Sequence, residues 1–390
     1  MASGRQLHIV FICNELPPAA AGGIGPAVLA FAEVLHNLGN TVSVIGAYDH
    51  DHAWNLPFAR VITVSPATFP GVNRLVSRNR LTATAIYSAL RQLNRAQPID
   101  IVEWPDFEGL FVKKIPGVVD VMRNHGPLMS HRLAGLAPLN EAIERAELRT
   151  MRSIENWIGV SSWFLEEWLR LSGARPLRKT VVPNPVDISI FFPTTEPASG
   201  PPFVLHAGTL CERKGTLALA KASNLFMREL PNIRLFLVGR EREDTLAQIE
   251  RLIGDDIRPR VVLAHPMPQR RLAELMRRAT VFAMPSLLES FGTVWAEAMA
   301  SGVPVVGSTR SCGPEVVPHG RAGLLVDPSD SSAIADAIVK LVTNPELSKR
   351  LGSFGREYAL KHYSLGKTAQ ETLDFYHTCL DAQARTRPRR

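Results

Sequence analysis

The sequence predicts an α/β protein made of two doubly wound, parallel-sheet domains. Short apolar runs rich in Val and Ile alternate with amphipathic stretches along the whole chain. A Pro-, Ser- and Gly-rich stretch interrupts this pattern at residues 194–202, after which the pattern starts again. The 390 residues are enough for two domains that each bury a core of their own.

The first half of the chain is expected to form one such domain, residues 1–190. Continuous apolar runs flanked by helices are typical of parallel strands that are covered on both faces. The expected strands are 7–12, 41–45, 61–64, 99–103, 118–123, 157–160 and 180–182. The expected helices are 27–38, 81–96, 138–153 and 162–171.

The second half is expected to form another domain of the same class, residues 191–362. Its expected strands are 203–206, 233–238, 261–264, 281–284, 303–306 and 324–326. Its expected helices are 216–229, 242–253, 270–278, 293–300, 332–343 and 346–361. Ligands bind at the carboxyl ends of parallel strands, so we expect the two sheets to face each other across a cleft.

A terminal helix and a short tail complete the predicted organisation. Residues 363–384 are expected to form a helix that packs back on the first domain. Residues 385–390, which include four arginines, are expected to be a basic tail that does not pack.

Charge and cysteine content exclude several classes of protein. The net charge is +7, but residues 1–190 contribute only +2 and the terminal arginines most of the rest, which argues against a nucleic-acid binder. The four cysteines are far apart and include no C-x-x-C, which argues against a disulfide scaffold or a zinc ribbon. No window approaches 18 uninterrupted apolar residues, so we expect a cytoplasmic protein without a membrane span.

Two glutamates eight positions apart form the motif with the most chemical content. Glu289 follows an apolar strand, and Glu297 lies about one turn inside the helix that Phe291-Gly292-Thr293 opens. Free backbone N–H groups at such a helix start suit a phosphate, and Glu297 could reach a ribose. A solvated helix start is the alternative explanation of this segment taken alone.

A second candidate segment follows the first strand of the second domain. Gly208 permits close backbone approach, and Arg213 and Lys214 place two positive charges at the start of the next helix. Such a pair could neutralise charge on a leaving diphosphate. An exposed basic turn is the alternative.

Two further candidate segments lie in the first domain. Gly22 and Gly23 belong to a loop between the first strand and the first helix, where glycines suit close approach to a phosphate or sugar. The loop does not match G-x-G-x-x-G, which counts against a nicotinamide or flavin site. His125 closes another strand before Gly126-Pro127, where it would face the cleft unless it is a structural histidine.

Together these segments resemble glycosyltransferase family 4, the nucleotide-sugar-dependent retaining enzymes of the GT-B fold. The resemblance covers nearly the whole chain and also includes residues 160–162, 182–187, 297–306 and 323–326. It implies a first domain that binds the acceptor and a second domain that binds the nucleotide sugar. Thr209 and His265 depart from the family pattern, since many members have Arg and Gly at these positions.

The resemblance also implies roles for individual residues. As catalytic residues, Arg213 and Lys214 would hold the donor diphosphate, Glu289 would contact hydroxyls of the donor sugar, and His125 would orient that sugar. The implied donor-binding residues are Gly22, Gly23, Gly208, Met267, Phe291, Gly292, Thr293 and Glu297. No cofactor and no metal ion are expected.

The expected reaction is transfer of a sugar, with retention of configuration, from a nucleoside-diphosphate donor to a hydroxyl acceptor. A UDP-sugar is favoured as donor and a GDP-sugar comes next, and the acceptor could be a sugar, a lipid-linked sugar or a small molecule. Biosynthesis of a polysaccharide, a glycolipid or a secondary-metabolite glycoside would use such a reaction. No nucleic acid is expected as a partner.

Three alternatives stay open at this stage. A nucleotide-sugar epimerase of the same fold would isomerise its donor without an acceptor. A non-catalytic sugar-nucleotide-binding module would keep the fold without the chemistry. Peripheral contact with the inner membrane surface is a further possibility, because arginines cluster at residues 74–95, although a solvated helix face is the favoured explanation.

Overall fold

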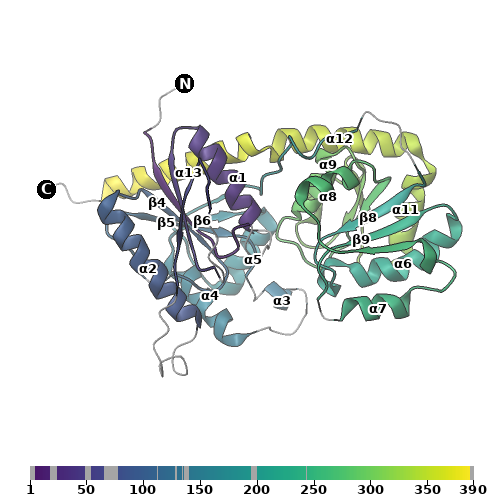
Figure 1. Cartoon of the computed structure of the whole chain (residues 1–390), viewed down its shortest axis with the longest axis horizontal. Helices are drawn as coiled ribbons and strands as arrows, with labels where there is room; N and C mark the ends of the chain where they lie inside the picture. The colour runs from purple at the N-terminus through teal and green to yellow at the C-terminus, as the bar shows by residue number, and fades with distance from the viewer. Residues whose placement is uncertain are drawn as a thin grey trace. The chain divides into compact units, whose positions relative to one another are not determined.

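The chain divides into two compact units (Figure 1). Its computed structural model describes residues 5–386 apart from 18–23, 49–53, 66–77, 112, 128–129, 134, 136–139, 195–199 and 243. Unit 1 comprises Met1–Pro185 and Leu365–Arg390, and unit 2 comprises Val186–Ser364. Each unit is a parallel sheet flanked by helices, so the predicted fold class is confirmed.

Unit 1 holds a seven-stranded sheet in the order β3-β2-β1-β4-β5-β6-β7, with every neighbouring pair parallel. The strands are β1 (His8–Ile12), β2 (Thr41–Gly46), β3 (Arg60–Thr63), β4 (Ile101–Pro105), β5 (Val119–Asn124), β6 (Asn156–Gly159) and β7 (Arg178–Val181). The central strands β1, β4 and β5 are buried along their whole length, as continuous apolar runs predict.

Helices cover both faces of this sheet. They are α1 (Ile24–Asn37), α2 (Arg78–Ala96), α3 (Ser130–Leu133), α4 (Glu141–Ser153), α5 (Ser162–Ser172) and α13 (Leu365–Thr386). Successive side chains of a strand point to opposite faces. Ile9 and Phe11 therefore pack with α1 and α13, while Val10 and Ile12 pack in the core that α2, α4 and α5 help to form.

Helix α13 is tied to the sheet of unit 1 by a buried polar network. The guanidinium of Arg123 on β5 donates to both carboxylate oxygens of Glu103 on β4, at 2.8 and 3.0 Å, and to Thr372 on α13 at 3.1 Å. The hydroxyl of Tyr376 donates to Glu103 at 2.5 Å. A buried charge pair is costly to break, so this network fixes α13 to the two central strands.

Unit 2 holds a six-stranded sheet in the order β10-β9-β8-β11-β12-β13, again parallel throughout. The strands are β8 (Phe203–Ala207), β9 (Arg234–Val238), β10 (Val261–Ala264), β11 (Val281–Ala283), β12 (Val305–Ser308) and β13 (Gly323–Val326). The helices are η1 (Glu212–Lys214), α6 (Thr216–Glu229), α7 (Thr245–Leu252), η2 (Arg258–Arg260), α8 (Gln269–Met276), α9 (Thr293–Ala300), α10 (Gly313–Val316), α11 (Ser331–Thr343) and α12 (Pro345–Tyr363).

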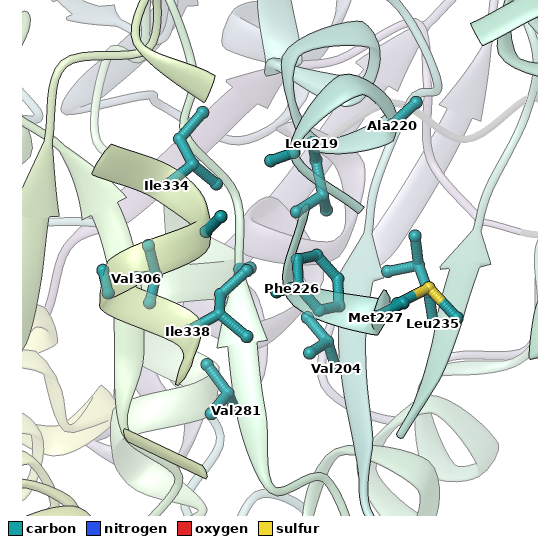
Figure 2. Packing of buried hydrophobic residues seen from close by; sticks show 14 of the residues in the cluster. Val204, Leu219, Ala220, Phe226, Met227, Leu235, Val281, Val306, Ile334 and Ile338 are labelled. Carbon is teal, nitrogen blue, oxygen red and sulfur yellow. The ribbon is translucent and has the colours of Figure 1, made fainter. Parts of the chain in front are cut away.

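The core of unit 2 lies between its sheet and helices α6 and α11. Figure 2 shows Phe226 of α6 and Ile338 of α11 directed at Val204 and Val281 of the sheet. All four side chains are fully buried. Burial of such side chains contributes about 1.5–3 kcal/mol each, so this layer is a large part of the stability of unit 2.

Two parts of the predicted organisation differ from the structure. The chain enters unit 2 at Val186 rather than at residue 191, because the N–H of Val186 donates to the carbonyl oxygen of Tyr363 at 2.8 Å and Arg277 donates to the carbonyl oxygen of Ile190 at 3.1 Å. In addition, α13 continues to Thr386, so Arg385 is helical rather than part of a tail.

Candidate functional site

The predicted donor residues of unit 2 lie on loops that leave neighbouring strands at the same edge of the sheet. Strand β8 pairs with β11, and the carboxyl ends of parallel strands meet at one edge. Gly208, Arg213 and Lys214 follow β8, whereas Glu289 and Gly292 follow β11. The sheet topology thus brings two distant sequence segments together.

The loop after β8 reaches its neighbours through backbone contacts that only glycine allows. Gly208 has a φ of +144°, and a Cβ on Gly239 would lie 1.6 Å from the carbonyl oxygen of Gly208. Gly215 has a φ of +74°, and a Cβ there would lie 2.0 Å from the carbonyl oxygen of Pro285. Helix η1, which carries Arg213 and Lys214, is consequently held against the loop after β11.

Lys214 and Glu289 form an ion pair at this junction. The Nζ atom of Lys214 lies 2.7 Å from the Glu289 carboxylate, and their side chains are 16% and 4% exposed. Burial acts to raise the pKa of Glu289, but the charges of Lys214 and Arg213 outweigh it and hold that pKa below its usual value. Arg213 itself donates to the carbonyl oxygen of Leu288 at 3.1 Å.

Helix α9 begins directly after this ion pair. Gly292, its N-cap residue, has a φ of +73° and, as a glycine, makes no side-chain capping hydrogen bond to the first turn. The ring of Phe291 is buried and meets Tyr363 edge to face, with the centroids 5.1 Å apart. Only the backbone of Phe291 is therefore available to a ligand, while Thr293 is half-buried at the first helical position.

Glu297 lies one turn into α9 and is 8% exposed. Burial raises its pKa to about 8, and a hydrogen bond with the side chain of Gln269 opposes this shift only in part. Gln269 begins α8 just after Met267, which is half-buried. The structure thus brings the segment of Met267 toward Glu297.

In unit 1, His125 follows β5 and is partly exposed. Burial, with a smaller effect from the nearby Arg123 charge, lowers the pKa of His125 to about 3, so its imidazole is neutral at any physiological pH. Gly22 and Gly23 lie outside the described residues.

Sequence reasoning missed Asp106, which follows β4 and is fully buried. Its carboxylate accepts hydrogen bonds from the N–H groups of His125 at 3.1 Å and of Gly126 at 3.2 Å. The signal that could have found it is its place just after the expected strand 99–103, which comes directly before the His125 strand in the chain. Ser311 was missed as well, and its hydroxyl accepts from the N–H of Glu289 at 3.1 Å.

The part of the chain that the structure describes contains neither a candidate metal site nor a candidate membrane-spanning helix. No group of three or more His, Cys, Asp or Glu side chains is placed to hold a metal ion among those residues. No helix formed by them has both the length and the apolar character to cross a membrane.

Two family models match the chain. The model described as Glycosyltransferase Family 4 matches residues 21–190, and the model described as Glycosyl transferases group 1 matches residues 187–358. Between them, the two matches run through most of both units.

Similar proteins occur in several bacteria. The alpha-maltose-1-phosphate synthase of Mycolicibacterium smegmatis is 27% identical over 408 residues, which cover 95% of this chain and 99% of that protein. The D-inositol 3-phosphate glycosyltransferase of Nocardioides sp. is 34% identical over 233 residues, which cover 54% of this chain and 51% of that protein.

Solved structures with the same fold include a sucrose-phosphate synthase from Thermosynechococcus elongatus, with a TM-score of 0.79 and 24% identity over 97% of this chain and 100% of that one. The Anabaena protein HepE in complex with UDP-glucose has a TM-score of 0.70 and 18% identity over 95% of this chain and 100% of that one. At these identities the likeness shows the fold. The two family matches and the named relatives show that this chain is an enzyme, a glycosyltransferase of the family 4 type with the GT-B fold.

Proposed function

We propose that this enzyme transfers a sugar, with retention of configuration, from a nucleoside-diphosphate donor to a hydroxyl acceptor. The observation that carries the proposal is the junction of Lys214, Glu289 and the uncapped first turn of α9. It offers positive charge and free N–H groups to an anion, beside a carboxylate that can accept from sugar hydroxyls. A diphosphate attached to a sugar has this pairing of anionic and hydroxyl groups.

Electrostatic stabilisation of the leaving diphosphate is the main catalytic task we assign to this junction. As the bond from the sugar to the diphosphate breaks, negative charge builds on the phosphate oxygens. Arg213, Lys214 and the N–H groups at Gly292 and Thr293 would oppose that charge, and such preorganised groups are each worth about 10²–10³ in turnover. Gly208 would let the backbone of the β8 loop approach the diphosphate.

The remaining site residues would bind rather than transfer protons. Glu297 would hydrogen-bond the ribose hydroxyls, and backbone groups near Met267 would bracket the base. His125, neutral because of its low pKa, would orient the transferred sugar by hydrogen bonding. The acceptor hydroxyl would attack on the face from which the diphosphate departs and would give its proton to that diphosphate, so no protein base is required.

UDP is the donor nucleotide we favour, with GDP next. HepE, which shares the fold, has been solved with UDP and with UDP-glucose. The relatives named for maltose 1-phosphate and inositol 3-phosphate suggest a sugar or polyol acceptor. A cytoplasmic location and catalysis without a metal ion stay predictions.

A thermal-shift panel tests the donor. UDP, GDP, ADP and their glucose conjugates are each added to the purified protein at millimolar concentration. We expect UDP and UDP-glucose to raise the Tm, since a ligand at 100 times its Kd stabilises the folded state by about 2.7 kcal/mol. Failure of every nucleotide to raise the Tm would count against the proposal.

The reaction is tested with the nucleotide sugar that gives the largest shift. A panel of sugars, sugar phosphates and polyols serves as acceptors, and proton NMR of the anomeric region reports the configuration of the product. A product with the donor's configuration supports retention. An isomerised nucleotide sugar formed without an acceptor would identify an epimerase instead.

A further inference from the structure

The carboxyl ends of β4 and β5 carry a buried carboxylate that the reaction described above does not use. Asp106 directly follows β4 and is 0% exposed. It accepts hydrogen bonds from the N–H groups of two consecutive residues, His125 at 3.1 Å and Gly126 at 3.2 Å. Gly126 has a φ of +127°, a conformation that favours glycine, so the chain turns directly after these two N–H groups.

The described residues form no ion pair with this carboxylate, and the groups that most favour its charge are backbone groups. The groups that favour its ionised form are the backbone N–H groups of Gly126, His125 and Asp106 itself, together with the side chain of Asn124. Burial outweighs them and raises its pKa to about 7. Burying a carboxylate without an ion pair lowers the stability of the fold. Its position behind His125 therefore suggests that it serves the site.

The two strands that carry Asp106 and His125 are themselves locked together. Arg123 on β5 pairs with Glu103 on β4 through two hydrogen bonds, two residues before His125. This pair fixes the register of the strands, and Asp106 then fixes the backbone of the residue beyond the strand end. The backbone that carries the imidazole of His125 is thus held by hydrogen bonds at two adjacent N–H groups.

We propose that Asp106 is a positioning residue that holds His125 where it can orient the transferred sugar. This inference rests on the proposed function, because the role of His125 in orienting the sugar is assigned there. The ionised carboxylate accepts from both N–H groups, and its protonation removes one acceptor. The hydrogen bonds that hold the backbone of His125 should therefore weaken as the pH falls through the pKa of Asp106.

The test compares Asp106→Asn with a matched control, Asp120→Asn. Asp120 lies near the amino end of β5, is 8% exposed, and accepts a hydrogen bond from the indole of Trp104 at 2.8 Å. Burial raises its pKa as well, to about 6. The control therefore removes a similar buried charge from β5, the strand that leads to His125, without touching the backbone of His125.

Turnover is measured between pH 5.5 and 8.5 with the nucleotide sugar that the thermal-shift panel selects. In the wild type we expect kcat to fall below pH 7 in a single protonation step. In Asp106→Asn we expect kcat to be lower by about tenfold or more at pH 8 and this step to be absent, with the donor KM little changed. Asp120→Asn should keep the wild-type kcat and the wild-type step.

A spectroscopic measurement keeps the proposal testable if Asp106→Asn folds poorly. In protein labelled with ¹⁵N-histidine, the backbone amide resonance of His125 should titrate near pH 7 in the wild type and in Asp120→Asn. The titration should disappear in Asp106→Asn. A His125 amide that does not titrate in the wild type, or an Asp106→Asn that loses no more turnover than Asp120→Asn, would overturn the inference.

A double variant separates failure of this inference from failure of the proposed function. If Asp106 acts through His125, the Asp106→Asn/His125→Ala double variant is no slower than His125→Ala alone. An additional loss in the double variant rules out action through His125 and leaves the proposed function standing. Wild-type turnover in His125→Ala would overturn both the role of His125 and the inference built on it.

Discussion

At the scale of single residues, the Lys214–Glu289 pair is the most consequential contact. We expect Lys214→Ala and Glu289→Gln each to lower kcat by a hundredfold or more, on the scale of losing one preorganised charge. Lys179→Ala is the matched control, because its pair with Glu166 is 45% and 64% exposed and lies in unit 1. Steady-state kinetics on variants with wild-type circular dichroism check this, and near-normal kcat in both site variants would refute it.

Glu297 gives a second prediction at this scale, on stability. Its pKa of about 8 in the folded protein lies above the usual 4.5, so the folded state retains a proton that the unfolded chain releases. The free energy of unfolding therefore falls as pH rises from about 4.5 to 8 on account of this residue. Glu297→Gln removes that fall and should be more stable than the wild type at pH 8 by at least about 1 kcal/mol.

Urea denaturation at pH 5 and pH 8 measures this difference. The advantage of Glu297→Gln should be small at pH 5 and should grow toward pH 8. Glu250→Gln, which changes an exposed glutamate on α7, serves as control and should show no such growth. A Glu297→Gln variant that is less stable than the wild type at pH 8 would contradict the pKa argument.

Sequence reasoning singled out candidate site residues that belong to recognisable chemistry and passed over those that would work through geometry. Glu289, Lys214 and Glu297 could be predicted because charged residues beside a helix start suggest a phosphate. Asp106 could not, because a carboxylate after a strand has no evident role until the register of β4 and β5 brings the N–H of His125 within 3.1 Å. Ser311 was missed for the same reason.

At the scale of elements, α9 depends on the glycine at its start. Gly292 has a φ of +73°, and a Cβ there would lie 2.3 Å from the ring of Trp295. Gly320 has nearly the same φ, +71°, but nothing within 4 Å of its Cβ position. Gly320→Ala should cost about 1–2 kcal/mol from backbone strain alone, and Gly292→Ala about 1–3 kcal/mol more from the collision.

Thermal or urea denaturation of the two variants separates these contributions. Gly292→Ala should also weaken nucleotide binding, because the first turn of α9 moves, while Gly320→Ala should bind normally. Equal losses of stability in both variants would show that the contact with Trp295 relaxes freely and does not hold the helix start.

Helix α2 carries the membrane alternative that the sequence left open. Arg80, Arg91 and Arg95 are exposed along it. If this face docks on lipid, the protein should co-sediment with phosphatidylglycerol vesicles at low salt and leave them at 0.5 M salt, because screening removes such attraction. The triple variant with Gln at these positions should stay in solution at low salt. A wild type that does not co-sediment removes the alternative.

Local patterns predicted the elements better than the boundary between the units. Helices α6 and α9 begin and end at the predicted residues, because their apolar spacing and flanking glycines are local signals. The crossing into unit 2 was placed too late, because Val186 and Ile190 are held there by Tyr363 and Arg277, which are distant in sequence. Short elements such as α3 and α10 are too brief to show a periodicity.

At the scale of the whole molecule, the two units differ in how the chain builds them. Unit 2 is one continuous segment, Val186–Ser364, with its own core, whereas unit 1 needs α13 from beyond unit 2. We therefore expect residues 186–364, expressed alone, to fold cooperatively and to bind the nucleotide that the full chain prefers. Circular dichroism and the thermal-shift panel measure this.

Residues 1–185 serve as the matched comparison. Without α13, Glu103 and Arg123 lose the hydroxyl of Tyr376 and the hydroxyl of Thr372, and the apolar face that α13 covers is exposed. We expect this fragment to unfold at a lower temperature or to aggregate. A residue 1–185 fragment as stable as the full chain would show that α13 contributes little to unit 1.

The return of α13 also has a consequence for the order of events on the ribosome. Domains commonly fold in the order in which they are synthesised. Here the segment that completes the sheet cover of unit 1 is translated only after all of unit 2. During synthesis, the first 185 residues wait with one face of their sheet covered by α1 but not yet by α13, so the half of the enzyme made first is the half finished last.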